Sequence, residues 1–420
     1  MMEREKSNVK GETFRIIHIG DAHLDQKHIA KIEPSLKQIL EYCENVKVNA
    51  AVIPGDIWHC KQSYSNSSAV PLLFDFLRKL SKLVDFIFIT KGNHDEAGSI
   101  SLLHQLEPNI FAYEYPVCLA VPVEDCFTPF DLLRDARAHS KDEFQFIVSL
   151  VPYPTKSMFL SDDSIDNNNA EFVEKFEQVF ELIGDVTQPY TCPKILGFHG
   201  NVVGSRLSSG QTLQSQDIMV APSTLEKANA DYYALNHIHL RQEIKPNMIY
   251  AGGIANFNWG ETEQKSFEVI ELDDFPVVFP KQILLISARP MVKLEFVFKN
   301  GVILDEELGY EYHGYIFDDN DDPEFRLRIK VFENERKLFT DEKINELKDF
   351  FGQDVKIEFN VIPTERESRS ERIMHCKTLV DEVKEYSTIS GYFDGYREEF
   401  LPITKEIETK VIQLQEEVRL

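Results

Sequence analysis

Short apolar runs that stop at clusters of polar residues recur along the chain, and this pattern leaves few folds open. Residues 14–20 (FRIIHIG), 50–53 (AAVI) and 86–90 (FIFIT) are rich in β-branched and aromatic residues, which is typical of buried strands. Apolar residues at helical spacing over 33–46 and 70–83 separate these runs. The alternation predicts an α/β fold, and such folds place their sites where the strands end.

The same arrangement returns further along the chain. Residues 144–151, 194–198 and 232–235 are again strand-like, and the last two lead into histidines. We expect the closing strands of the domain at 248–254 and 266–272. Prolines and a change in charge over 273–281 indicate a domain border, so that residues 1–275 form the first domain.

Five polar motifs follow these runs and contain six of the twelve histidines. They are Asp21-Ala-His23, Gly55-Asp56-Ile-Trp-His59, Gly92-Asn93-His94-Asp95, His199-Gly200 and His237-Ile-His239. Carboxylate, amide and imidazole groups together suit two adjacent divalent cations such as Mn²⁺. A carboxylate that bridges the two ions would hold them close together.

Each motif alone has an ordinary structural explanation. An isolated Asp-x-His step is more often a turn or a helix cap than a pair of ligands. Because all five motifs follow apolar runs in one chain, we interpret them as one metal-dependent catalytic site. The histidines outside the motifs are interpreted as structural or surface residues: His18, His28, His104, His139, His313 and His375.

In order and spacing, the motifs resemble those of the calcineurin-like metallophosphoesterase superfamily over roughly residues 14–272. Within it, the chain looks most like the SbcD-like nucleases that process DNA double-strand breaks, including their phage relatives. This narrower resemblance depends on His59, on LSSGQTL after His199, and on YALNHIHLRQ, YAGGIANFNWGE and KSFEVIEL. It implies an α/β core with two β-sheets in a sandwich, flanked by helices.

The resemblance also implies which residues hold the metal ions. One ion would be held by Asp21, His23, Asp56 and His239. The other would be held by Asp56, Asn93, His199 and His237, so that Asp56 is the bridge. The implied cofactors are two Mn²⁺ ions, with Mg²⁺ as a weaker substitute.

Three further residues receive catalytic roles from the resemblance. His94 would be the acid or charge stabiliser for the leaving oxygen, and Asp95 would orient it. His59 would position the phosphate or the scissile nucleotide. The implied activity is a metal-dependent DNA exonuclease on duplex ends and an endonuclease on single strands or hairpins.

One residue departs from the family pattern, since Asn236 replaces the glycine before His-x-His. If that glycine has a left-handed backbone, asparagine is the next most tolerant residue and the turn survives. If the glycine instead makes room for a close neighbour, Asn236 would crowd the second ion. We favour the first explanation, which predicts a left-handed backbone at Asn236.

Residues 282–362 are typical of a small α+β domain, with a helix over 340–351 that starts after Thr340 as its N-cap. By the resemblance, this domain caps the site and orients DNA. Its basic residues would either face phosphate or belong to a mixed, solvated surface. They are Arg326, Arg328, Lys330, Arg336 and Lys337.

Residues 364–420 have apolar residues in three- and four-residue steps, which predicts two short amphipathic helices. By the resemblance, they dock on an SbcC-like ABC-type ATPase, and the chain forms a homodimer. Packing of these helices on the chain's own body is an equal alternative.

The formal net charge of −25 argues against a chain that grips DNA with a broad basic surface. Bound divalent cations or a partner subunit could supply the missing positive charge. No run is long and apolar enough to span a bilayer, and the charged segment MMEREKSNVK predicts a cytoplasmic protein, in a host cytoplasm if phage-encoded.

Two other functions compete with a break-processing nuclease. A phosphatase or cyclic-nucleotide phosphodiesterase would use the same metal core, but it needs neither a DNA cap nor a docking helix. A catalytically silent scaffold subunit is the third possibility, and the complete set of ligand residues argues against it.

Overall fold

The structure is a computed structural model. It describes residues 13–60, 68–123, 128–135, 139–155, 169–208, 218–272, 280–286, 288–315, 323–363, 375–390 and 397–417. The described residues fall into two compact units. Each unit consists of two segments of the chain. The first unit contains the residues up to Lys293 and a short later segment that ends at Phe325. The second unit contains the segment that begins at Leu294 and the residues from Arg326 onward.

The first unit contains a six-stranded sheet whose central strands are parallel. Strands β1, β2, β3 and β4 run parallel to one another, β14 is antiparallel to β1, and β15 is antiparallel to β14. In spatial order the strands are β15 (Pro280–Leu284), β14 (Ser266–Glu271), β1 (Arg15–His18), β2 (Ala50–Pro54), β3 (Phe86–Thr90) and β4 (Ile110–Tyr113).

A second sheet of seven strands lies against the first. Strands β7, β8, β11 and β13 are parallel, and its outer strands are antiparallel to their neighbours. The spatial order is β12 (Gln242–Lys245), β13 (Met248–Tyr250), β11 (Tyr232–Asn236), β8 (Lys194–His199), β7 (Phe144–Val151), β5 (Val117–Pro122) and β6 (Phe130–Asp131). A short parallel pair, β9 (Asn201–Val202) and β10 (Met219–Val220), follows β8.

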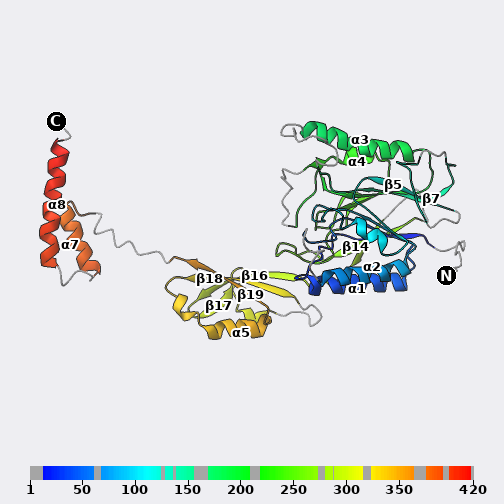
Figure 1. Cartoon of the computed structure of the whole chain (residues 1–420). Coiled ribbons are helices and arrows are strands. Elements are labelled where there is room, and N and C mark those ends of the chain that lie inside the picture. The colour runs from blue at the N-terminus through cyan, green and yellow to red at the C-terminus, as the bar shows by residue number, and fades with distance from the viewer. Residues whose placement is uncertain are drawn as a thin grey trace. The chain divides into compact units, whose positions relative to one another are not determined.

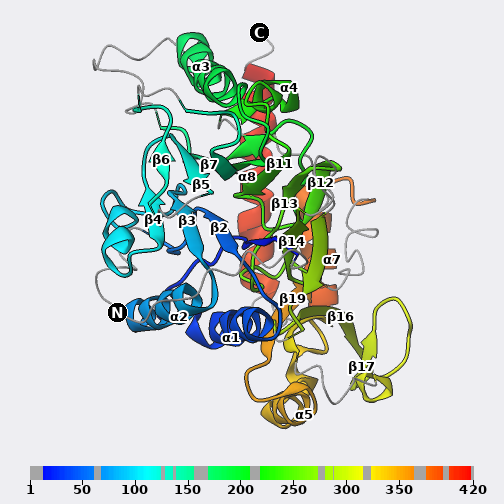
Figure 2. The same ribbon diagram turned by 90° about the vertical axis from the view of Figure 1, so that its right-hand side faces the viewer.

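The two sheets stack between two layers of helices, as Figure 1 shows for the first unit. Helices α1 (Ile29–Asn45) and α2 (Ala69–Leu83) lie side by side on the outer face of the first sheet (Figure 2). Helices α3 (Asn169–Thr187) and α4 (Pro222–Glu226) cover the second sheet. The unit is therefore a sandwich of two sheets flanked by helices, which confirms the predicted fold class.

Burial on both faces explains why the strands are apolar along their whole length. In β2, Ala51 and Ile53 pack toward α1 and α2, whereas Ala50 and Val52 belong to the core between the two sheets. On the far side, Phe180 of α3 packs with Phe198 of β8. Each strand is thus held from two sides, and the polar residues that follow it are placed by a rigid scaffold.

The predicted strands agree with these elements to within a few residues. The segments 86–90 and 144–151 are β3 and β7 as predicted, and the predicted helices at 33–46 and 70–83 are α1 and α2. The predicted strand at 248–254 is shorter, because β13 ends at Tyr250 and the chain then turns through Gly252 (φ 82°). Gly253 after this turn pairs with Asp21.

A four-stranded sheet and a helix that packs on it belong to the second unit. The sheet has the order β17 (Val302–Asp305), β16 (Met291–Lys299), β18 (Glu324–Phe332) and β19 (Lys356–Ile362). Helix α5 (Asp341–Phe351) starts after Thr340, the predicted N-cap residue, although the Thr340 side chain forms no capping hydrogen bond. Phe351 of α5 packs near Phe296 of β16. Short 3₁₀ segments of this unit lie at Tyr312–Gly314 and Arg336–Leu338, and the first unit has one at Ser101–Gln105.

Three basic residues of this sheet, Arg326, Arg328 and Lys330, are paired with acidic ones. Arg328 lies 3.4 Å from Glu358 and 3.7 Å from Glu295. Arg326 pairs with Glu358, and Lys330 with Glu306. These contacts favour the mixed, solvated surface over a row of cations directed at phosphate.

Near the end of the chain, α7 (Leu379–Ser390) and α8 (Arg397–Glu417) pack on each other. The backbone N–H of Leu379 donates to Glu408. The first part of the predicted helical segment, residues 364–374, lies outside the described residues. Apolar side chains of α8 remain exposed, among them Phe400, Ile403, Ile407 and Val411.

The predicted division at residues 275 and 364 stays a prediction, because both borders lie in segments outside the described residues. Within the described part of the chain, no helix has an apolar stretch that could cross a bilayer.

Candidate metal centre

The loops after β1 and β2 are joined by main-chain hydrogen bonds. The N–H groups of Ala22 and His23 both donate to the carbonyl of Asp56, each at 3.0 Å. Pairing continues from Leu24 to Trp58. The N–H of Asp21 donates to Gly252 in the loop after β13, at 3.1 Å. The polar motifs that follow these strands are therefore fixed relative to one another by the backbone.

The loops after β2 and β3 approach so closely that only glycine fits between them. A Cβ atom on Gly92 would lie 2.1 Å from Oδ1 of Asp56 and 2.3 Å from its backbone nitrogen. A Cβ atom on Gly55 would lie 2.6 Å from the backbone nitrogen of Gly92 and from Nδ1 of His199. The glycines of the two motifs thus let Asp56 and Asn93 share one small space.

Gly92→Ala is expected to lower the free energy of unfolding by about 1–3 kcal/mol, since the added methyl group overpacks the loop. It should also weaken Mn²⁺ binding, because Asp56 must move. Gly260→Ala is the matched control, since a Cβ atom there meets nothing within 4 Å. Urea unfolding and Mn²⁺ titration of both variants check this prediction, and equal values for the two would contradict it.

Unusual backbone conformations mark three of the predicted ligands. Among described residues other than glycine, positive φ angles occur at two asparagines and at His23 (43°), Asp56 (50°) and His237 (107°). Such a conformation costs about 1–3 kcal/mol for a residue that does not favour it. Strain at three residues of one site indicates that their side chains are placed there for a function.

The first group of predicted ligands gathers around His23. Its Nε2 atom lies 2.9 Å from Nε2 of His239 and 3.6 Å from Oδ2 of Asp56. Nδ1 of His239 donates to Glu261 at 2.9 Å, so Nε2 of His239 keeps its lone pair. Two imidazole nitrogens that face each other in this way fit a cation that both would bind.

The second group gathers around Asn93. Its Oδ1 atom lies 3.1 Å from Nε2 of His199 and 2.9 Å from Nδ1 of His237. Nε2 of His199 is also 3.3 Å from Oδ2 of Asp56. Nδ1 of His199 donates to the Pro54 carbonyl at 2.6 Å, which leaves Nε2 as the ligand atom. Asp56 therefore contacts both groups, as a bridging ligand must.

Asp21 also contacts residues of the second group, His237 and His199. Its two carboxylate oxygens accept the backbone N–H of His237 at 3.2 and 3.1 Å. Oδ1 also lies 3.8 Å from Nδ1 of His199. The structure thus brings together all seven predicted metal ligands, and donor triads that include Asp56 occur on both sides.

The charges of the buried carboxylates also fit bound cations. Burial raises the pKa of Asp21 to about 7, with His199 opposing this and Asp56 adding to it. The pKa of Asp56 is lowered, because His199 and His23 outweigh its burial. The pKa of His199 rises to about 9, since Asp56 and Asp21 outweigh its burial. A divalent cation among these groups would stabilise both carboxylates in their ionised form.

A family model described as calcineurin-like phosphoesterase matches residues 14–241, which is more than half of the 420 residues. The chain belongs to the calcineurin-like phosphoesterase family. The match covers the strands that carry all the predicted ligands. Family and site together make this chain a metal-dependent phosphoesterase, and its ligand residues suit divalent metal ions.

A crystal structure of a putative 5′-nucleotidase from Staphylococcus aureus in complex with α-ketoglutarate is similar to this chain at 13% identity, with a TM-score of 0.35. The alignment covers 74% of this chain and 57% of the nucleotidase chain. Similarity at this level carries no information about the substrate of this phosphoesterase. A search of the curated proteins gave no match.

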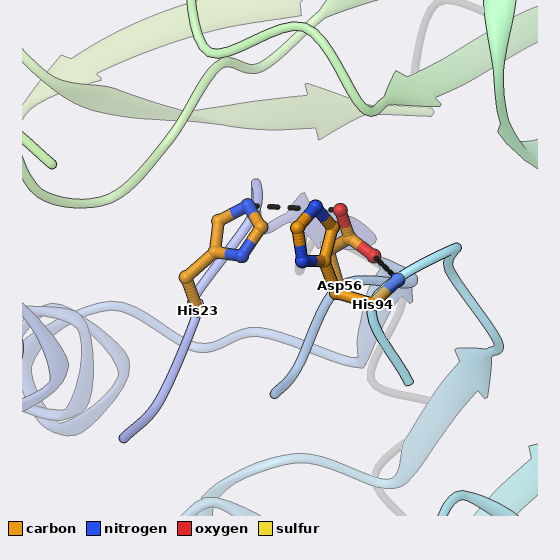
Figure 3. A group of neighbouring side chains, drawn as sticks. All are labelled: His23, Asp56 and His94. Atoms are coloured by element: carbon orange, nitrogen blue, oxygen red, sulfur yellow. Dashed lines mark hydrogen bonds and ion pairs between the residues drawn. The ribbon is translucent and has the colours of Figure 1, made fainter. Parts of the chain in front are cut away.

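His94 of the phosphoesterase lies beside the first group of ligands. Figure 3 shows His23, Asp56 and His94 converging from three loops. The backbone N–H of His94 donates to Oδ1 of Asp56 at 3.0 Å. Nδ1 of His94 lies 2.6 Å from the carbonyl of His59, so that Nε2 is left for a substrate. The His59 and His94 rings are stacked, with centroids 6.1 Å apart.

The contact predicted between Asp95 and the His94 ring is wrong. The two oxygens of Asp95 accept the backbone N–H groups of Trp58 and Gly92, at 2.9 and 2.8 Å. Asp95 therefore ties the loop after β2 to the loop after β3. The carbonyl of His59 is the group that holds the His94 ring.

The prediction of a left-handed backbone at Asn236 is also wrong. Asn236 is the last residue of β11, and it is the following residue, His237, that has a positive φ. The buried Asn236 side chain lies 3.0 Å from Nε2 of His18 and donates to the carbonyl of Ile19 at 3.2 Å. These hydrogen bonds to the last residue of β1 and to the residue after it hold Asn236 in the strand.

Glu261 is a candidate positioning residue that the sequence motifs did not reveal. It is buried, and its Oε1 accepts from Nδ1 of His239. Asn258 and Phe257 also donate to Glu261, and Nζ of Lys265 lies 2.8 Å from its Oε2. Burial raises the pKa of Glu261, but the contacts with His239 and Lys265 outweigh it and lower this pKa. The only signal in the sequence is its place in YAGGIANFNWGE.

Glu261→Gln is expected to weaken Mn²⁺ binding or activity by about 10- to 100-fold, which is typical when the partner of a metal-binding histidine is changed. The neutral amide no longer fixes the His239 tautomer. Glu263→Gln is the matched control, because Glu263 also contacts Lys265. Mn²⁺ affinity by calorimetry checks this, and an unchanged affinity in Glu261→Gln would remove the role given to Glu261.

Proposed function

We propose that this phosphoesterase is a Mn²⁺-dependent DNA nuclease, the nuclease subunit of an SbcD-like break-processing complex. The observation that carries the proposal is the pair formed by His59 and His94 beside the ligand cluster. A small phosphoester needs one group to protonate its leaving oxygen. A second histidine next to the first suits a substrate that continues beyond the scissile bond.

His94 is positioned to act on the leaving oxygen. Its Nδ1–H is used by the His59 carbonyl, so in the charged ring Nε2–H is the proton that can be given away. Its backbone is tied to Asp56, which keeps the ring at a fixed distance from the ligands. When bound, the two divalent ions would supply positive charge to the phosphate and to the attacking water.

The parts of the chain beyond the matched family segment support a large substrate and a partner. The second unit adds a separate sheet, and α8 exposes Phe400, Ile403 and Ile407. We propose that the α7–α8 pair docks on an SbcC-like ABC-type ATPase and that the complex contains two copies of this chain. Short helices of this kind gain stability when a partner buries their apolar side chains.

The acidic character of the chain lowers the affinity for DNA that we expect of the chain without a partner. The formal net charge is −25, and Arg326, Arg328 and Lys330 are paired with acidic residues. Since phosphate neutralisation supplies most of the non-specific affinity for DNA, we propose that the metal ions and the ATPase partner supply this charge.

The test is degradation of end-labelled duplex and single-stranded DNA by the full chain, with Mn²⁺, Mg²⁺ or chelator, alone and with the ATPase partner. We expect cleavage that requires Mn²⁺. Hydrolysis of a small phosphodiester with no DNA cleavage, even with the partner present, would instead favour a phosphatase or cyclic-nucleotide phosphodiesterase. Absence of all hydrolysis would favour a scaffold subunit.

A further inference from the structure

A third group of possible metal ligands lies next to the predicted binuclear site. It consists of Asp25, His28 and His59, and one donor atom of each lies within 4.8 Å of the other two. Oδ1 of Asp25 is 2.7 Å from Nδ1 of His28. The rings of His28 and His59 have centroids 4.7 Å apart. Two imidazoles and a carboxylate thus converge outside the seven ligands described above.

The main chain fixes this convergence. His28 is the residue before α1, and the backbone N–H of His28 donates to Oδ1 of Asp25 at 2.9 Å. The backbone N–H of His59 donates to the carbonyl of Leu24 at 3.1 Å. The extended pairing of the loops after β1 and β2 therefore carries His59 to the side of Asp25.

Polar atoms of the group lack the hydrogen bonds that buried atoms normally have. Within the described residues, Nδ1 of His28 and Nδ1 of His59 are both shielded from water and form no hydrogen bond. The 2.7 Å approach of His28 to Asp25 does not have hydrogen-bond geometry. A buried polar atom without a hydrogen-bond partner has a free-energy cost, because it has lost its contacts with water. A bound cation would remove at least part of this cost.

We propose that Asp25, His28 and His59 bind a third divalent transition-metal ion. Two imidazoles with one carboxylate favour ions such as Zn²⁺ or Mn²⁺ over Mg²⁺ or Ca²⁺, which prefer oxygen ligands. Three protein ligands leave positions open for water or for a phosphate oxygen. His59 would then contact a substrate phosphate through the ion.

The start of α1 opposes a cation, because a helix N-terminus carries a partial positive charge of about +0.5. The full negative charge of Asp25 outweighs this partial charge. Asp25 and His28 are only partly buried, with 14% and 19% of their side chains exposed, so an ion has access from solvent. The charge balance therefore permits a cation, in a chain whose formal net charge is −25.

Metal counting tests the proposal without any substrate, so its outcome is independent of the proposed nuclease activity. The full chain is stripped with chelator and dialysed against Zn²⁺, and the bound metal per chain is measured by atomic emission. We expect three ions in the unaltered chain and two in both Asp25→Asn and His28→Gln. Asp75→Asn and His313→Gln, at exposed positions, should keep three ions.

Two results would overturn the proposal. One is a count of two ions in the unaltered chain. The other is a third ion that persists in both Asp25→Asn and His28→Gln, which would place it elsewhere on the surface. A variant that keeps two ions is folded, because the binuclear site is intact. If one variant loses all three ions, it has not folded correctly, and the count in the other variant decides the test.

Discussion

Asp56→Asn is expected to reduce Mn²⁺-dependent phosphodiesterase activity by about a thousand-fold, because the metal ions would no longer stabilise the transition state by several kcal/mol. Oδ2 of Asp56 lies 3.6 Å from Nε2 of His23 and 3.3 Å from Nε2 of His199, so this one carboxylate serves both ligand groups. An amide has the same shape but only one good ligand atom and no charge. The variant should therefore fold and fail to bring two ions together.

The measurement is hydrolysis of a chromogenic phosphodiester over a range of Mn²⁺ concentrations, together with the number of ions bound. Asp75→Asn is the matched control, because Asp75 is an exposed residue of α2 paired with Lys79. Activity of Asp56→Asn within tenfold of the unaltered chain at saturating Mn²⁺ would show that Asp56 is not the shared ligand.

His94→Ser has the second largest expected effect, a loss of about 10²- to 10⁴-fold in the rate of DNA cleavage, which is typical when a general acid is removed. Metal binding should be unchanged, because the contact of His94 with Asp56 comes from its backbone N–H. Serine keeps that N–H and removes only the ring. The loss should therefore fall on the rate constant and not on the affinity for Mn²⁺.

Steady-state kinetics on labelled DNA and Mn²⁺ calorimetry separate the two effects. His313→Ser is the control, since His313 is an exposed histidine of the second unit. A His94→Ser variant that cleaves DNA at the normal rate would exclude His94 as the acid. A variant that loses Mn²⁺ would instead make His94 a ligand, as its grouping with His23 and Asp56 permits.

The location of the site could be predicted because polar residues directly follow strands that are apolar along their whole length. Strands such as β2 and β3 are apolar on both faces, so the polar residues that follow them stand out in the sequence. Parallel strands then place these residues at one edge, where Asp56 and Asn93 both reach His199. The order of apolar and polar residues along the chain was therefore sufficient to predict where the site lies.

The details that could not be predicted depend on contacts between residues far apart in the sequence. Asn236 stays in the strand because it bonds to His18 and Ile19, more than 200 positions away. Asp95 accepts N–H groups from two loops, and only the folded loops show which. Glu261 acquires its role from its contact with His239. Local patterns contain no information on such pairings.

We infer that these ligands form a metal-dependent phosphoesterase site bridged by Asp56. The most direct test is the hydrolysis of a chromogenic phosphodiester by chelator-treated chain, before and after Mn²⁺ is returned, beside Asp56→Asn. We predict no hydrolysis without metal, recovery with Mn²⁺ in the unaltered chain, and no recovery in the variant. Hydrolysis in the presence of chelator, or equal recovery in both proteins, would contradict the claim.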